Sequence, residues 1–186
     1  MELAICPRSI PAERLLTRGV YVGSATLDPN DAATYALTDF HRESPISVPA
    51  DRPIDEAFGD MNRLGIHALL VTRSEPGGEE RMLGLLTSYR IKQRRADARR
   101  LPPELRAHGA LSVGEIMTPW HELALLKYAS LEYLRVIELA KMFQGSGLTH
   151  VLVVEADGDD SLVARGLISR AAIAICLGRS SRPGER

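Results

Sequence analysis

Two hydroxyl residues, Thr87 and Ser169, have the surroundings that phosphate binding requires. Each lies between an apolar strand pattern and a helical pattern, and the unpaired backbone N–H groups at a helix start can hold a phosphate. Arg90 and Arg170 fall in the first turns of the two helices, where the helix dipole disfavours a cation and a bound anion would reverse that effect. The four residues indicate two anion sites, unless the hydroxyls only cap the helices and the arginines extend into solvent.

The sequence contains no common catalytic or metal-binding motif. Residues 145–147, Gly-Ser-Gly, lack the Gly-Lys-Ser/Thr ending of a nucleotide-cleaving loop and are more typical of a helix C-terminus. No Gly-x-Ser-x-Gly occurs, no carboxylate pair stands out as acid and base, and no histidine or cysteine has ligand spacing. We therefore expect no catalytic residue, no metal and buried free thiols. The residues concerned are His41, His67, His108, His121, His150, Cys6 and Cys176.

The elements that must position the two hydroxyls occur twice. Gly-Ile-His-Ala-Leu-Leu-Val-Thr at 65–72 precedes Gly-Leu-Leu-Thr at 84–87, as Gly-Leu-Thr-His-Val-Leu-Val-Val at 147–154 precedes Gly-Leu-Ile-Ser at 166–169. Small repeats that cannot bury their own apolar faces are expected to pair. The duplication predicts two like units related by a pseudo-twofold axis, with equivalent clefts between them.

Each repeat is predicted to run strand, helix, strand, strand, helix, which makes the chain an α+β protein with helices on one face of small sheets. In the first repeat the expected elements are 45–49, 51–64, 68–72, 82–87 and a helix from 88. In the second they are an extended piece at 115–119, one long helix over 129–143, strands 151–155 and 162–168, and a helix over 170–177. Gly84 and Gly166 lie inside strand patterns, which predicts close approach by another backbone or by a ligand.

The repeats divide the chain into five parts. These are an N-terminal extension at 1–36 that packs onto the repeats, a first repeat at 37–93, a basic linker at 94–110, a second repeat at 111–178 and a flexible tail at 179–186. The run from Arg90 to Arg106 holds seven basic and two acidic residues. Such a run is either a solvated face or a site for a phosphate-bearing ligand or polynucleotide.

Composition is that of a soluble globular protein, with 45% apolar residues, 25% charged residues and a net charge of −1. No apolar run is long enough to cross a membrane, and the first residues lack a secretory signal pattern. We therefore expect a cytoplasmic protein that does not bind a membrane. The near-zero net charge argues against a nucleic-acid partner.

The ordered set of motifs resembles a tandem pair of cystathionine-β-synthase-type (CBS) domains, an arrangement called a Bateman module. The resemblance covers about residues 37–177 and is carried by Glu-Ile-Met-Thr-Pro at 115–119 together with the two repeated glycine motifs. In the first copy Leu-Thr-Asp-Phe at 37–40 stands where Met-Thr-Pro is expected.

The resemblance implies two clefts that bind an adenosine-containing ligand such as AMP, ADP, ATP or S-adenosylmethionine, with no cofactor required. In that family a hydroxyl contacts phosphate, as Thr87 and Ser169 would, and an aspartate three residues later holds the ribose. Arg90 and Ala172 occupy the aspartate positions here. The adenine pocket would lie near His67 and Ala68, His150 and Val151, and Thr118 and Pro119.

Three functions follow from these patterns. The first, which the resemblance implies, is a non-enzymatic regulatory module that forms a homodimer, senses an adenosine ligand and acts in trans on a partner protein. The second is an assembly or dimerisation protein with vestigial clefts, which the missing aspartates favour. The third is nucleic-acid binding through residues 90–106, which the net charge does not favour.

Overall fold

A computed structural model describes residues 3–4, 27–76, 80–100, 111–157 and 161–180. The chain divides into two compact units. Residues 44–123 make up most of one, here called the central unit, and residues 21–43 with 124–186 make up most of the other, here called the split unit. Several expectations lie outside the described residues, namely Cys6, the side chain of Cys176, His108, residues 101–110 of the basic linker and residues 181–186 of the tail.

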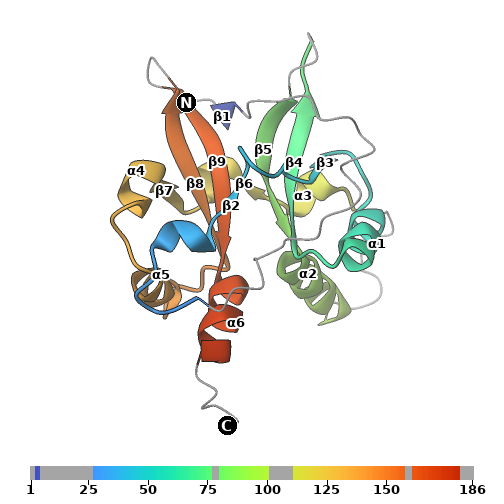
Figure 1. Cartoon of the computed structure of the whole chain (residues 1–186). Coiled ribbons are helices and arrows are strands. Elements are labelled where there is room, and N and C mark those ends of the chain that lie inside the picture. The colour runs from blue at the N-terminus through green and yellow to red at the C-terminus, as the bar shows by residue number, and fades with distance from the viewer. Residues whose placement is uncertain (1–2, 5–26, 77–79, 101–110, 158–160, 181–186) are drawn as a thin grey trace. The chain divides into compact units, whose positions relative to one another are not determined.

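The central unit contains a mixed sheet. Strand β3 is parallel to β4, β4 is antiparallel to β5, and the short strands β1 and β6 both pair with β5 (Figure 1). The elements are β1 (Leu3–Ala4), β3 (Ser47–Pro49), α1 (Ile54–Leu64), β4 (Ala68–Ser74), β5 (Glu80–Thr87), α2 (Ser88–Arg100), α3 (Val113–Ile116), β6 (Thr118–Pro119) and the 3-10 turn η4 (Trp120–Glu122).

Apolar periodicity explains why α1 forms and where it packs. Its buried residues, Ile54, Ala57 and Met61, share one face and join a core that includes Leu86 of β5 and Ile91 of α2. The helix ends at Gly65, whose φ of 66° places it in the left-handed region that glycine adopts readily. This core holds the end of β5 against the start of α2.

The split unit repeats this topology. Strand β7 is parallel to β8, β8 is antiparallel to β9, and the short strand β2 pairs with β9. Its elements are η2 (Ala33–Ala36), β2 (Thr38–Asp39), β7 (Leu125–Lys127), α4 (Tyr128–Leu131), α5 (Val136–Phe143), β8 (His150–Asp157), β9 (Ser161–Ser169) and α6 (Arg170–Ser180). The expected α+β fold with two small sheets is confirmed.

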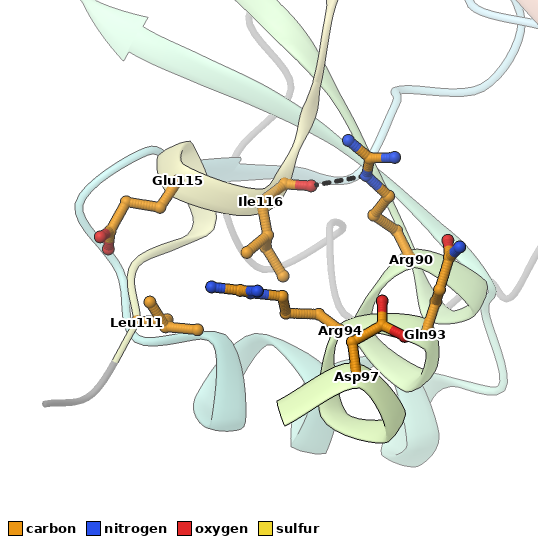
Figure 2. Close-up of a pocket in the computed structure, with 7 residues that line it drawn as sticks. All are labelled: Arg90, Gln93, Arg94, Asp97, Leu111, Glu115 and Ile116. Carbon is orange, nitrogen blue, oxygen red and sulfur yellow. Dashed lines mark hydrogen bonds between the residues drawn. The ribbon is translucent and has the colours of Figure 1, made fainter. Parts of the chain in front are cut away.

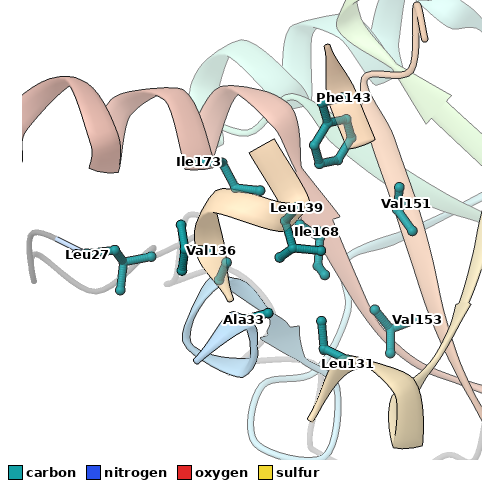
Figure 3. Close-up of a cluster of buried hydrophobic side chains, with 11 residues drawn as sticks. Leu27, Ala33, Leu131, Val136, Leu139, Phe143, Val151, Val153, Ile168 and Ile173 are labelled. Atoms are coloured by element: carbon teal, nitrogen blue, oxygen red, sulfur yellow. The ribbon is translucent and has the colours of Figure 1, made fainter. Parts of the chain in front are cut away.

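A separate core fills the split unit. Leu139 and Phe143 of α5, Val151 and Val153 of β8 and Ile168 of β9 meet there (Figure 3). Residues from the N-terminal extension complete it; they are Leu27, Ala33 and Ala36. The described part of the extension therefore packs onto a repeat, as expected, because it contributes buried apolar surface.

The short strands β2 and β6, which begin the two repeats and are here called the leading strands, each pair with the sheet of the other repeat. Thr38 of the first repeat pairs with Leu167 of β9, and Thr118 of the second repeat pairs with Leu85 of β5. The compact units are therefore assembled from pieces of both repeats.

The expected long helix over 129–143 is wrong. The chain forms α4 and α5 with a break at 132–135, where Arg135 N–H donates to Glu138 Oε2 at 2.7 Å and starts α5. At the break Ala33 N–H donates to the carbonyl of Leu134 at 2.9 Å, so the extension uses backbone groups that a continuous helix would have paired internally. The apolar periodicity of 129–143 carries no information about this hydrogen bond from the N-terminal extension, and so it could not predict the break.

Two further expectations need correction. Residues 94–100, placed in the linker, are the second half of α2, because the segment is rich in helix-forming Arg and Ala residues. Glu115 and Ile116 are not extended but belong to α3, where Ser112 N–H and Oγ both donate to the Glu115 carboxylate, at 2.7 and 2.8 Å.

Gly84 and Gly166 permit the close backbone approach that their positions predicted. A Cβ at Gly84 would collide with the carbonyl oxygen of Thr118, and a Cβ at Gly166 would collide with that of Thr38. The neighbour is backbone in both units, so neither collision can be relieved by a side-chain movement. These contacts hold β6 and β2 in place.

An ion-pair cluster, not predicted from the sequence, fastens β2 to β9. Arg165 occupies a bulge of β9 and donates from Nε and Nη2 to the two oxygens of Asp39, at 3.0 and 3.1 Å. Its Nη1 donates to Glu155 at 2.9 Å, and its guanidinium lies 4.5 Å from the ring centroid of Tyr128. Burial opposes ionisation of Asp39, but the bonds from Arg165 and from His41 N–H prevail and lower its pKa.

A methyl group at either close approach should destabilise the fold. Gly84→Ala and Gly166→Ala are each expected to lower the free energy of unfolding by about 1 to 3 kcal/mol. Gly59→Ala in α1 is the matched control, because a Cβ there would meet no described atom, and it should raise stability by about 0.5 to 1 kcal/mol. Urea denaturation measures the free energy of unfolding of all three variants. Equal changes for Gly59→Ala and Gly84→Ala would contradict the close backbone approach at Gly84.

The Asp39–Arg165 pair should make stability depend on acid pH. Because folding lowers the Asp39 pKa, its contribution is complete above the unfolded pKa of about 4 and is lost as pH falls through the folded pKa. Asp39→Asn should therefore cost about 1.5 to 3 kcal/mol at pH 7, and the difference from wild type should shrink near pH 3. Asp51→Asn, at an exposed carboxylate, is the control with little effect at either pH.

Candidate functional site

The end of β5 and the start of α2 form the strand–helix junction of the central unit. Thr87 is buried, and its Oγ1 accepts a hydrogen bond from Arg90 N–H at 3.2 Å. Ser88 N–H donates to the carbonyl of His67 at 2.9 Å, and Ala68 pairs with Thr87 in the sheet register. The structure therefore brings His67, Ala68, Thr87 and Arg90 together.

The leading strand β6 adds the other predicted residues of this junction. Pro119 pairs with Gly84 and Thr118 with Leu85, three and two residues before Thr87 respectively. Arg90 Nε donates to the carbonyl of Ile116 at 3.2 Å and so ties the first turn of α2 to the end of α3. Arg90 is exposed, but it does not simply extend into solvent.

A pocket of about 530 Å³ lies beside this junction, between one face of α2 and the segment that contains α3 (Figure 2). The α2 residues follow the spacing of a single helix face, and one of them, Arg90, also belongs to the junction. The lining residues are Arg90, Gln93, Arg94, Asp97, Leu111, Glu115 and Ile116. From the sequence, Arg90 was expected to be a site residue, and Gln93, Arg94 and Asp97 lie in the basic run that was one possible anion site. Leu111, Glu115 and Ile116 had been assigned to no site.

The charged side chains that line the pocket differ in whether they already have hydrogen-bond or ion-pair partners. Hydrogen bonds from Ser112 N–H and then from its hydroxyl lower the pKa of Glu115, with a smaller contribution from Arg94. Asp97 lies 3.6 Å from a guanidinium nitrogen of Arg100. Both carboxylates thus have partners at the pocket edge, whereas Arg94 makes no hydrogen bond within the part of the chain described.

The strand–helix junction of the split unit has the same backbone construction. Ser169 Oγ accepts a hydrogen bond from Ala172 N–H at 3.4 Å, and Arg170 N–H donates to the carbonyl of Thr149 at 2.9 Å. His150 pairs with Ser169 in the register, and Val151 is buried in the core. The structure therefore also brings these four predicted residues, His150, Val151, Ser169 and Arg170, together.

Both hydroxyls are helix caps, which was one of the two interpretations of the sequence. Capping uses the oxygen as an acceptor and leaves the hydroxyl proton available, so it is compatible with phosphate binding. The two arginines, however, are not equivalent. Arg90 occupies the third position of its helix, where the split unit has Ala172, and Arg170 occupies the first position, where the central unit has Ser88.

The described part of the basic run, residues 90–100, is not a uniformly free cationic face. Arg95 pairs with Asp55 and lies 4.6 Å from the ring centroid of Phe58, while Arg90 and Arg100 have the partners described above. The ion pairs of Arg95 with Asp55 and of Arg100 with Asp97 therefore neutralise part of the positive charge of α2, whereas the bond from Arg90 to a carbonyl leaves its charge in place.

Other kinds of site were sought in the described residues. No group of three or more His, Cys, Asp or Glu side chains there could hold a metal ion. Nor does the described part of the chain contain a helix that is long and apolar enough to span a membrane.

Comparison with known proteins agrees with this architecture. Residues 37–97 match the model of the CBS domain family. No curated protein matches the chain in sequence.

Solved structures resemble the chain over most of its length. An uncharacterized conserved protein from Pyrococcus horikoshii has a TM-score of 0.53 and 19% identity, covering 86% of this chain and 99% of its own. A CBS-domain containing protein from Agrobacterium tumefaciens has a TM-score of 0.52 with the same identity and coverages. The CBS domain of a bacterial CNNM/CorC family Mg²⁺ transporter in complex with ATP has a TM-score of 0.50 and 13% identity, covering 81% and 89%. The chain thus has the fold of a tandem CBS pair.

Loss of the Thr87 cap should be measurable without any ligand. Thr87→Val removes the acceptor for Arg90 N–H and is expected to lower the free energy of unfolding by about 1 kcal/mol. Thr87→Ser keeps the hydroxyl and should retain most of the stability. Urea denaturation followed by circular dichroism tests both variants, and a valine variant as stable as wild type would disprove the cap.

Proposed function

We propose that this chain, whose residues 37–97 are a CBS domain, is a non-enzymatic regulatory module that binds an adenosine-containing ligand and acts in trans on a partner protein. The observation that carries the proposal is the junction of the central unit. There a hydroxyl, the start of a helix and a guanidinium converge beside a pocket that can hold a small molecule.

The residues have separate parts in the proposed binding. The Thr87 hydroxyl accepts from Arg90 N–H and can donate its proton to a phosphate oxygen. The backbone near Ala68 and Thr118 would contact the adenine, whose edge offers both donors and acceptors. The ATP complex of the similar transporter domain supports an adenine nucleotide as the ligand class.

The absence of a ribose-binding carboxylate bears on affinity. Arg90 and Ala172 stand where a carboxylate would accept two charge-assisted hydrogen bonds from the ribose. Such a contact is worth about 1.5 to 3 kcal/mol, so the proposed sites bind a nucleoside about ten- to a hundredfold more weakly than sites that have it. A weak site suits a metabolite that is abundant in the cell.

A homodimer is part of the proposal. Tyr35, Tyr89 and Tyr133 are among the exposed large apolar side chains, with 69%, 60% and 87% of their surface accessible. Aromatic residues of this kind are enriched in protein interfaces, because they bury a large area with few rotatable bonds. They offer contact area for a second copy or for the partner.

A second candidate function is assembly without a ligand. One observation favours it, namely that both hydroxyls already have a structural role as caps while neither repeat has the ribose carboxylate. In that case the two junctions maintain the fold and the exposed tyrosines carry the function.

Calorimetric titration with AMP, ADP, ATP and S-adenosylmethionine tests the proposal. At least one of the four should give a saturable heat of binding. Thr87→Val should weaken that binding about tenfold, because it removes a donor to phosphate, and Thr87→Ser should preserve it. Flat titrations with all four ligands would instead support the assembly function, and a salt-dependent shift with RNA or DNA would support nucleic-acid binding.

A further inference from the structure

We infer that the α2–α3 pocket of the central unit selects ligands that carry two or more phosphate groups, and that the split unit has no such selection. This inference rests on the proposed function, because it specifies the ligand class at one of the two proposed sites. It follows from the positions of Arg90 and Arg94 in α2 and from the uncharged residues that occupy the corresponding positions in α6.

Arg90 is oriented by a contact that leaves most of its donors available. Its Nε donates to the carbonyl of Ile116, whereas its two terminal nitrogens make no hydrogen bond within the described residues (Figure 2). A guanidinium held in this way loses less conformational entropy when it binds a phosphate than one on a free side chain. Arg90 is therefore a preorganised donor at the pocket.

Arg94 supplies a second guanidinium one helical turn further along the same face. It lines the pocket and makes no hydrogen bond with any described residue, although it interacts electrostatically with Glu115. Side chains four residues apart on a helix have Cβ atoms about 5 to 6 Å apart, so the two guanidiniums can reach different phosphate groups of one ligand. A monophosphate has only one group to share between them.

The carboxylates of the pocket do not cancel this preference. Glu115 accepts two hydrogen bonds from the neutral donors of Ser112 and stays ionised, and Asp97 lies beside the positive charge of Arg100, so both carboxylates are engaged by groups other than the terminal nitrogens of Arg90 and Arg94. Gln93, between the two arginines in sequence, adds an amide donor to the lining. The pocket's available hydrogen-bond donors are thus mainly the guanidinium N–H groups of Arg90 and Arg94. Hydrogen bonds from such charged donors to phosphate are stronger than hydrogen bonds between neutral groups.

The split unit lacks this arrangement. Ala172 replaces Arg90, while Ile173 is buried at the position of Ile91, which establishes that the two helices present corresponding faces. Arg170 lies at the first helical position and is exposed. The next six residues, 171–176, are Ala, Ala, Ile, Ala, Ile and Cys, so the sequence places no cation at 176, the position that corresponds to Arg94. Selection by phosphate number is therefore confined to one site per chain.

Calorimetry with AMP, ATP and inorganic tripolyphosphate tests the inference on the full chain. Wild type should bind ATP at least about tenfold more tightly than AMP at one site per chain. Arg94→Gln should reduce this ATP-to-AMP ratio about tenfold, because loss of the second guanidinium weakens the binding of ATP more than the binding of AMP. Lys92→Gln is the matched control, because Lys92 is an exposed cation of the same helix that does not line the pocket.

Thermal melting should find Arg94→Gln folded, since the side chain is exposed, and Arg94→Lys provides a second variant that should keep part of the ratio. An ATP-to-AMP ratio near one, or a ratio equal in Arg94→Gln and wild type, would overturn the inference while leaving adenosine binding intact. Arg94-dependent binding of tripolyphosphate without binding of any adenosine compound would refute the proposed function and support the phosphate selection. Failure of every ligand would refute both.

Discussion

A backbone carbonyl packed directly on a glycine is the contact on which both units depend. Thr118 lies over Gly84 in the central unit and Thr38 lies over Gly166 in the split unit, at a distance that no Cβ would allow. Because of this approach each leading strand can pair with the sheet of the other repeat. In the central unit it also brings Ile116 to Arg90 and so creates one wall of the pocket.

The two units keep one backbone plan and differ in the side chains placed on it. Each hairpin has a bulge directly before its glycine, with Leu83 unpaired in β5 and Arg165 unpaired in β9. Leu83 packs against the core, whereas Arg165 binds Asp39. Asp39 pairs with Gly166 in the sheet, and at the corresponding place in the central unit Pro119 pairs with Gly84. The aspartate that departs from the Met-Thr-Pro motif therefore has a structural cause, because it is the acceptor for the bulge arginine.

The same divergence separates the two junctions. Both helices start with a hydroxyl cap and a backbone hydrogen bond to the preceding strand pair, so the framework for holding an anion is present twice. Charge is concentrated at one of them, where α2 places arginines toward α3. In the proposed function, the junction that has both Arg90 and Arg94 responds to the phosphate number of a ligand, and the junction that has Arg170 alone does not.

Short-range patterns in the sequence determined the repeat, the order of strands and helices from residue 45 to the start of α2, the caps at Thr87 and Ser169 and the close approaches at Gly84 and Gly166. These features depend on a residue and its immediate neighbours, through periodicity, helix capping and the lack of a side chain. The tertiary structure alone decided the break between α4 and α5, the exchange of leading strands, the Asp39–Arg165 pair and the pocket beyond Arg90. Each of these features depends on a contact between groups on different elements, most of them far apart in the chain. The energy of such a contact depends on the partner group, which the local sequence does not identify. Gln93 and Arg94 did have a local signal, their spacing from Arg90 on one helix face, but only the position of α3 made that face a pocket.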